Sequence, residues 1–203
     1  GPNQTDFLKL VHGAQGTMGI VSWSSIKLEL KPTRQEAFFV GAGTLEALLD
    51  YTYAIVTPRW ADEVMILNKV DLACLFRLTG SEIEQLMARL PEWVLFYTIA
   101  GYRDLPEKRV QYLKLDIQDC AARFGIEPAT ELGGLSAMRL ADLLTHASAE
   151  RYWKLRLKGS CEDIFFLTTL NRAPEFTQAM QAEAAKAGMP AESLGVYIQP
   201  IQQ

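Results

Sequence analysis

Residues 92–101, "EWVLFYTIAG", are an apolar run rich in β-favouring residues, and they predict a strand. A long helix is predicted directly after it, with Pro106 in its first turn and Gly125 as a left-handed cap. The apolar residues of this helix recur at helical spacing and predict one buried stripe, made of Val110, Leu113, Ile117, Cys120 and Phe124. The centre of the chain therefore alternates strand and helix.

Segments of similar build precede this centre. "EAFFVG" (36–41) and "EVMILN" (63–68) predict strands, and the apolar spacing between them predicts a helix over 45–56. Before the first of these strands, "IVSWSSIKLEL" (20–30) alternates apolar and polar residues and predicts a half-exposed antiparallel strand that ends before Pro32. Ser81 and Glu84 have the spacing of a capping box and predict the start of a further helix.

The last third of the chain repeats the alternation. "DIFFLTTL" (163–170) and "GVYIQPI" (195–201) predict strands on either side of a helix over 174–188. Between these and the central helix, "SAMRLADLL" (136–144) predicts a helix in a segment inserted beside the sheet. Few strands separated by helices predict an α+β fold, ferredoxin-like, with a largely antiparallel sheet and helices on one face.

Composition excludes several functional classes. The 203 residues are 49% hydrophobic and carry a formal net charge of -4, which argues against a dedicated nucleic-acid-binding protein. Three scattered cysteines and two remote histidines predict neither a disulfide framework nor a metal site. The chain has no apolar run long enough to cross a bilayer and no signal peptide, so we expect a cytoplasmic protein with no transmembrane segment.

Glycines cluster in "HGAQGTMGIVS" (12–22), where Gly13, Gly16 and Gly19 precede the predicted strand over 20–30. Glycines at this density let a ligand approach the backbone closely and leave N–H groups free to meet an anion. The pattern is neither a Walker A loop nor a dinucleotide fingerprint that opens a helix. A mobile glycine-rich turn without a ligand remains an equally acceptable interpretation. A second glycine pair, Gly41 and Gly43, predicts only a tight turn between strand and helix, because Glu46 would repel a pyrophosphate.

The segments "GAQGTMGIV" (13–21) and "SSIKLELKP" (24–32) together resemble the FAD-linked oxidases of the vanillyl-alcohol oxidase and D-lactate dehydrogenase type. In that family the loop runs Gly-x-x-Gly-Thr-Leu-Gly-Ile, and the strand after it ends at a proline that marks entry to the cap domain. Met18 replaces the leucine here, which conserves volume. The resemblance extends to "YWKLR" (152–156) and "GVYIQP" (195–200), and so covers essentially the whole chain.

This resemblance implies a domain division and a set of site residues. Residues 1–33 correspond to the C-terminal remnant of the FAD-binding domain, and residues 34–203 to a cap domain that is incomplete at its C-terminus. The backbone along FAD is implied to be that of Gly16, Thr17, Gly19 and Ile20. Arg156 matches an arginine that meets the substrate carboxylate in hydroxy-acid relatives, but Leu157 stands where many relatives have an acidic residue.

The resemblance also implies a function. The chain opens on Gly1 and Pro2 and closes on the apolar run "SLGVYIQPIQQ", so we expect a fragment of a longer protein. The full-length parent is expected to be an FAD-dependent oxidoreductase that oxidises a small alcohol or 2-hydroxy acid, with the fragment inactive and free of FAD. Its partners would be the substrate and the remainder of the FAD-binding domain, and homo-oligomerisation is left open. The alternative is a non-catalytic, ferredoxin-like ligand-binding or regulatory module.

Overall fold

The computed structural model of the chain describes residues 11, 13–28, 30–146 and 148–200. The chain divides into two compact units, residues 1–31 and residues 32–203. In the first unit, residues 20–28 and 30 form neither helix nor strand, so the strand predicted there is wrong for these residues, and position 29 lies outside the described part. Alternation fixes which side chains share a face, but a strand also needs a paired neighbour.

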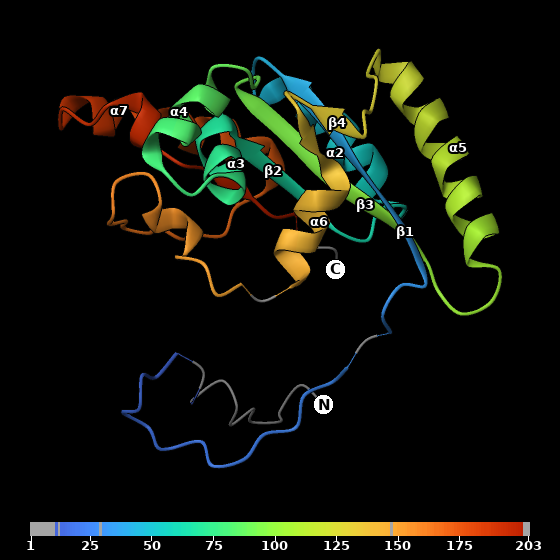
Figure 1. The fold of residues 1–203 in the computed structure, drawn as a ribbon, viewed down its shortest axis with the longest axis horizontal. Coiled ribbons are helices and arrows are strands. Elements are labelled where there is room, and N and C mark those ends of the chain that lie inside the picture. The colour runs from blue at the N-terminus through green and yellow to red at the C-terminus, as the bar shows by residue number, and fades with distance from the viewer. Residues whose placement is uncertain (1–10, 12, 29, 147, 201–203) are drawn as a thin grey trace. The chain divides into compact units, whose positions relative to one another are not determined.

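The second unit is built on a four-stranded sheet in the order β1-β3-β2-β6 (Figure 1). The strands are β1 (Arg34–Ala42), β3 (Trp93–Gly101), β2 (Val64–Asn68) and β6 (Tyr197–Ile198). Each neighbouring pair is antiparallel, and Phe39 of β1 stands opposite Phe96 of β3. The predicted α+β class with an antiparallel sheet is therefore confirmed, as is the strand predicted over 92–101.

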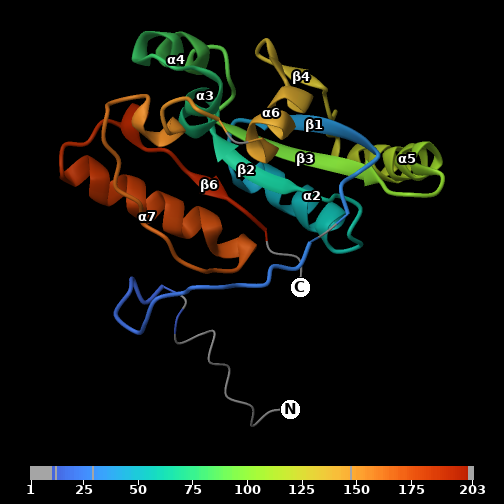
Figure 2. The same ribbon diagram turned by 60° about the horizontal axis from the view of Figure 1, so that its bottom comes forward.

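Helices cover both faces of this sheet, whereas the sequence predicted them on one. α2 (Glu46–Val56) and α5 (Pro106–Phe124) share one apolar core with the sheet. α3 (Lys69–Phe76), α4 (Gly80–Met87) and α6 (Ala137–Thr145) share a second core on the opposite face. Figure 2 shows these two layers on either side of the strands. The cause lies in β3, whose nine residues are all buried, so that both of its faces require cover.

The strand order is ferredoxin-like only in part. β1 and β2 run in the same direction with β3 between them, which is the split βαβ arrangement. A ferredoxin-like sheet carries its fourth strand beside β1, whereas β6 pairs with β2. The outer edge of β1 is already used, because Phe39 and Ala129 exchange both backbone hydrogen bonds, at 2.7 and 2.9 Å. The segment after α5 thus takes the edge that a ferredoxin-like fourth strand would use.

Helix ends follow the sequence closely, with one shift. α5 begins at Pro106 and is followed by Gly125 at φ 64°, as predicted. The capping box of α4 lies two residues earlier than predicted: Thr79 and Glu82 form it instead of Ser81 and Glu84. Thr79 donates to Glu82 Oε2 from both its backbone N, at 3.3 Å, and its hydroxyl, at 2.7 Å.

The remaining elements lie after α5. Two short strands, β4 (Glu131–Leu132) and β5 (Leu135–Ser136), form a small hairpin before α6. α7 (Ala173–Lys186) confirms the predicted last helix. The strand predicted over 163–170 is wrong, because residues 163–169 have no regular structure. Of the strand predicted over 195–201, only Tyr197 and Ile198 form one, and residue 201 lies outside the described part. None of the described helices has the length and apolar character needed to span a bilayer.

Candidate functional site

The glycine loop of the first unit has the backbone that its sequence requires. Gly13, Gly16 and Gly19 have φ values of 73°, 83° and 146°. Residues other than glycine rarely adopt backbone conformations with φ in this range. Thr17 closes a turn inside the loop, donating to Ala14 O from its backbone N at 2.9 Å and from its hydroxyl at 2.6 Å. The loop therefore contains a hydrogen-bonded turn, and replacing any of its three glycines would strain the backbone.

Part of the loop backbone is open to a ligand such as a dinucleotide. The N–H groups of Gly16, Gly19 and Ile20 donate to no described residue, and a Cβ placed on Gly16 or Gly19 would meet nothing within 4 Å. Open amides of this kind are suited to an anion. The amide of Thr17 is already used inside the turn. Three of the four positions thus fit the implied FAD contact, and the assignment of all four to FAD stays a prediction.

Arg156 lies directly after a short 3₁₀ turn, Trp153–Leu155, that contacts α3. Its Nε donates to Arg151 O at 2.8 Å, and its Nη1 donates to Cys74 O at 3.2 Å and to Leu75 O at 3.1 Å. The two carbonyls belong to the last turn of α3, where helical carbonyls lack intrahelical donors. The guanidinium therefore caps the C-terminal end of α3.

These contacts limit what Arg156 can offer to a ligand. A carboxylate bound bidentately uses either Nε with Nη2 or Nη1 with Nη2. Both pairs include a nitrogen that already donates to the described backbone. With these contacts kept, a substrate carboxylate would meet Nη2 alone. The role of Arg156 toward a substrate stays a prediction, beside a capping role that the geometry gives directly.

No sequence pattern singled out a buried carboxylate on α3, the helix that Arg156 caps. Asp71 lies in the first turn of α3 and is only 8% exposed. Its backbone N–H donates to Asn68 Oδ1 at 3.1 Å. Burial of a carboxylate costs folding free energy unless nearby charges or hydrogen bonds offset it.

A lysine and a second carboxylate face Asp71. Lys154 Nζ forms an ion pair with Asp163 Oδ1 at 2.5 Å, and the Lys154 side chain is only 13% exposed. The ammonium also lies over the rings of Trp153 and Tyr197, at 5.3 and 5.1 Å from their centroids. Through Tyr197 these contacts join the 3₁₀ turn to β6. Through Asp163 they join it to residues 160–169, which form neither helix nor strand. Asp71, Lys154 and Asp163 thus form an acid–lysine cluster.

The electrostatics of this cluster set the protonation of Asp71. Burial raises the pKa of the Asp71 carboxyl to about 6, opposed by the nearby Lys154 ammonium and reinforced by the Asp163 carboxylate. A carboxyl with a pKa near neutrality is suited to proton transfer. Burial, with the Asp71 charge, raises the pKa of the Cys74 thiol to about 11. Cys74 is therefore protonated at neutral pH and unsuited to act as a nucleophile.

Asn68 fixes the chain that covers this cluster. Its Oδ1 accepts from Val196 N at 3.0 Å, and its Nδ2 donates to Leu194 O at 2.7 Å. Gly195, between them, lies against the Asp71 carboxylate. One signal in the sequence could have identified the cluster: Asp71 is the one charged residue in the otherwise apolar run 70–76. Its partner Lys154, 83 positions later, could not be assigned to it from the sequence.

A pocket of about 340 Å³ lies elsewhere, at the N-terminal ends of α2 and α7. Its acidic groups are already engaged: Gln178 Nε2 donates to Glu46 Oε1 at 3.2 Å, and Lys69 pairs with Glu92 at 2.7 Å. The lining residues are Gly43, Thr44, Leu45, Glu46, Glu92, Trp93, Pro174, Thr177, Gln178 and Gln181. Gly41 lies near the end of β1, where a Cβ would stand 2.8 Å from Pro91 Cγ, and residues 43–45 form the short connection to α2 that the sequence predicted.

Comparison with known proteins gives little similarity. No protein-family model matches the sequence, and no curated protein matches it. Among solved structures, the chain is similar to p-cresol methylhydroxylase with substrate bound, at 19% identity and a TM-score of 0.39. That match covers 56% of this chain and 25% of the other, so the chain spans about a quarter of that protein's length. A TM-score this low supports no functional assignment.

Proposed function

We propose that this chain is part of an FAD-dependent oxidoreductase that oxidises a small alcohol or 2-hydroxy acid. In this proposal residues 1–33 end the FAD-binding domain, and residues 34–203 form most of the cap domain. The observation that carries it is the glycine loop, in which Gly16 and Gly19 both have positive φ and leave their amides open. The boundary between the two compact units, after residue 31, supports the same division.

The residues of the loop take defined roles in this proposal. FAD, when bound, supplies the redox chemistry. The open amides of Gly16, Gly19 and Ile20 meet the dinucleotide, and the Thr17 hydroxyl holds the turn closed through Ala14 O. Arg156 binds the substrate carboxylate through Nη2 while its other nitrogens stay on α3. The remainder of the FAD-binding domain is the required partner.

The test uses the full-length protein encoded by the gene. We expect it to purify with a flavin absorption spectrum, and we expect a small alcohol or a 2-hydroxy acid to bleach that spectrum anaerobically. Gly16→Ala and Gly19→Ala should lower the flavin content, because each forces a side chain into positive φ at the dinucleotide. Gly188→Ala is the matched control, since Gly188 has φ 73° at the end of α7. A flavin-free full-length protein contradicts the proposal.

The second candidate is a non-catalytic ligand-binding or regulatory module. The observation that favours it is the pocket beside α2 and α7, which mixes polar side chains such as Gln178 and Gln181 with apolar ones such as Trp93. The two candidates differ in one measurement. A binding module should retain its ligand affinity in the 203-residue chain, whereas the isolated part of a flavoenzyme should be colourless when it is purified with added FAD.

A further inference from the structure

The chain at residues 194–198 lies over the Asp71 carboxylate as a single layer. A Cβ built on Gly195 would overlap Asp71 Oδ1, so the backbone at Gly195 touches the carboxylate. Asp71 is only 8% exposed, whereas Gly195 is itself exposed to solvent. One thickness of backbone therefore separates the carboxylate from water on this side. Residues 194–198, which include β6, form a strap across the start of α3.

The strap belongs to the least buried part of the sheet. β6 lies at the edge of the sheet, beside β2 (Figure 2), with Tyr197 opposite Leu67 and Ile198 opposite Ile66. None of residues 194–198 is buried. The Tyr197 ring adds an edge-on contact with Trp153, at 6.3 Å between centroids. Short segments at a sheet edge open more readily than core strands, so the strap can leave while the rest of the sheet stays folded.

Asn68 links the strap to Asp71 directly. Its Oδ1 accepts from the backbone N of Asp71 at 3.1 Å and from the backbone N of Val196 at 3.0 Å. Its Nδ2 donates to Leu194 O at 2.7 Å, and its backbone N donates to Val196 O at 2.9 Å. One side chain thus caps α3 and holds the strap closed.

The charges around Asp71 balance in only one protonation state. Lys154 faces it from the 3₁₀ turn and Asp163 from residues 160–169, and Lys154 Nζ is bonded to Asp163 at 2.5 Å. Cys74, on the same helix, is a protonated thiol, and Tyr197 of the strap is a neutral ring over the ammonium. One ammonium therefore serves two carboxylates. The acid–lysine cluster is neutral when Asp71 carries its proton and has a net negative charge when Asp71 is ionised, and burial of an unbalanced charge is unfavourable.

We propose that ionisation of Asp71 opens the strap, so that residues 194–198 leave β2 and the carboxylate becomes solvated. The proton passes to water, and the closed strap returns when Asp71 is protonated again. Opening relieves the buried charge at low cost, because the pairing of β1, β3 and β2 and both apolar cores stay in place. The open state leaves β2 as the edge strand of the sheet. This device is independent of the proposed flavin chemistry.

The direction of the pH dependence follows from where Asp71 binds its proton more tightly. With the strap closed, burial raises the pKa of Asp71 to about 6, and in the open state we expect its ordinary value, 3.8. The closed strap is therefore fully favoured below pH 3.8, and this preference is lost as pH rises through about 6. A difference of about two pKa units changes the opening equilibrium about 100-fold. Arg156, at the other end of α3, stays charged throughout and adds no pH dependence.

Hydrogen exchange of single amides tests the proposal in the unmodified 203-residue chain. The reporting amides are those of Asn68 and Val196, which bond between the strap and β2. Their protection factors, which divide out the intrinsic pH dependence of exchange, should fall about 10- to 100-fold between pH 4.5 and pH 7.5.

Urea distinguishes opening of the strap from unfolding of the whole chain. Opening a short segment exposes little surface, so low concentrations of urea should hardly change the protection of the Asn68 and Val196 amides. Amides in the centre of β3 should be better protected than these two at pH 7.5, and their protection should fall with urea, because β3 is buried along its whole length.

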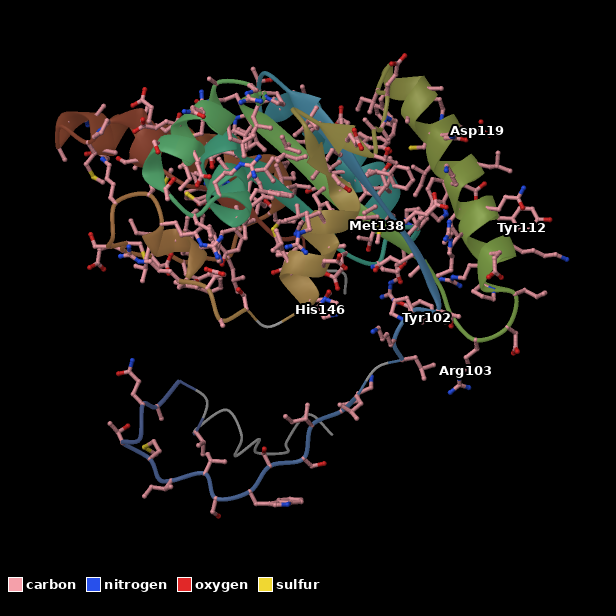
Figure 3. All side chains as sticks on the ribbon, in the orientation of Figure 1. Tyr102, Arg103, Tyr112, Asp119, Met138 and His146 are labelled. Carbon is pink, nitrogen blue, oxygen red and sulfur yellow. The ribbon has the colours of Figure 1, made fainter. Side chains whose placement is uncertain are left out.

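Two matched variants identify the titrating group. Asp71→Asn keeps the shape of the side chain and removes its ionisation, so the fall in protection between the two pH values should disappear. Asp119→Asn is the control, since Asp119 is an exposed carboxylate on α5 (Figure 3). This control should keep the full fall in protection at Asn68 and Val196.

Three results overturn the proposal. The first is equal protection of the Asn68 and Val196 amides at both pH values in the unmodified chain. The second is a fall in protection that persists in Asp71→Asn, which would assign the pH dependence to another group. The third is protection of the strap amides that falls with urea as steeply as that of β3, which would mean that the strap opens only when the whole chain unfolds. None of these results depends on flavin, so failure here is separate from failure of the proposed enzymatic function.

Discussion

Gly195 lies directly against the Asp71 carboxylate, so that a Cβ built on Gly195 would overlap Asp71 Oδ1. Asp71 cannot move away freely, because it is buried in α3 and its backbone is tied to Asn68. Position 195 therefore accepts only glycine while Asp71 keeps its place. The contact also explains why the chain at 194–196 can approach α3 closely enough for both Asn68 side-chain atoms to bond to it.

We expect Gly195→Ala to lower the free energy of unfolding by about 1–3 kcal/mol, the cost of forcing an extra carbon into a packed site. Urea denaturation of the 203-residue chain measures this change. Gly43→Ala is the control, because a Cβ there would meet nothing within 4 Å and should change stability little. Combining Gly195→Ala with Asp71→Ser, which shortens the opposing side chain, should recover part of the loss. An alanine variant as stable as the parent chain would contradict the close contact.

The stability of the chain should depend on the ionisation of Asp71. Its pKa is about 6 in the folded chain and 3.8 as the ordinary value, so the folded chain binds more protons between these pH values. The stability from this group is therefore complete below pH 3.8 and is lost as pH rises through about 6. Asp71→Asn removes the ionisation, so it should stabilise the chain at pH 7.5, by about 1–3 kcal/mol at 1.36 kcal/mol for each pKa unit.

Denaturation at two pH values checks this. At pH 4 the Asn variant and the parent chain should have similar stability, because Asp71 is then largely protonated in the folded chain. Glu107→Gln on the exposed side of α5 is the control and should show no comparable difference between the two pH values. A variant that is less stable than the parent chain at pH 7.5 would show that Lys154 compensates fully for the burial of Asp71.

How far the sequence predicts this fold depends on how local the signal is. The strand over 92–101 and the helix from Pro106 to Gly125 are encoded within their own residues, by apolar pattern and by end residues, and both form. The strands over 20–30 and 163–170 have the same local signals but form no strand in the described residues. A strand depends on a partner elsewhere, which its own sequence does not name.

In the candidate site too, local features could be predicted from the sequence and long-range contacts could not. The glycine-dense loop is visible in the sequence, and its residue type permits the positive φ that Gly16 and Gly19 have. The capping contacts of Arg156 with Cys74 and Leu75 join positions about 80 residues apart, and no local pattern encodes them. The position of Lys154 beside Asp71 has the same long-range origin. Helices on both sheet faces also escaped prediction, since the count of helices does not say which face each one covers.

The capping box of α4 provides a local test of where that helix begins. Thr79 bonds to Glu82, and the Thr79 hydroxyl, by this hydrogen bond, holds the pKa of the Glu82 carboxyl below its usual value. We expect Thr79→Ala to lower Tm by about 2–4 °C, since loss of a cap typically costs about 1 kcal/mol. Ser81→Ala should leave Tm nearly unchanged, because Ser81 lies inside the helix. The reverse order of effects would place the helix start two residues later.

Arg156→Lys separates a structural from a substrate-binding role. Lysine keeps the charge but cannot reproduce three N–H donations from one planar group, so the cap on α3 should weaken. In the 203-residue chain we expect the free energy of unfolding to fall by about 1–3 kcal/mol. Arg151→Lys is a matched control: Arg151 Nη2 donates once, to Gly159 O at 3.1 Å, so a smaller loss is expected.

In the full-length protein the same substitution tests contact with substrate. If Arg156 binds a substrate carboxylate, kcat/KM for a 2-hydroxy acid should fall about 10- to 1000-fold, the range expected when a buried charged hydrogen bond is broken. Values for an uncharged alcohol should change little, and flavin content should be unchanged, because the proposed dinucleotide contacts lie in residues 16–20. An equal fall for both substrate classes would identify Arg156 as a positioning residue that acts through α3. Unchanged kinetics with lowered stability would leave Arg156 with its capping role alone.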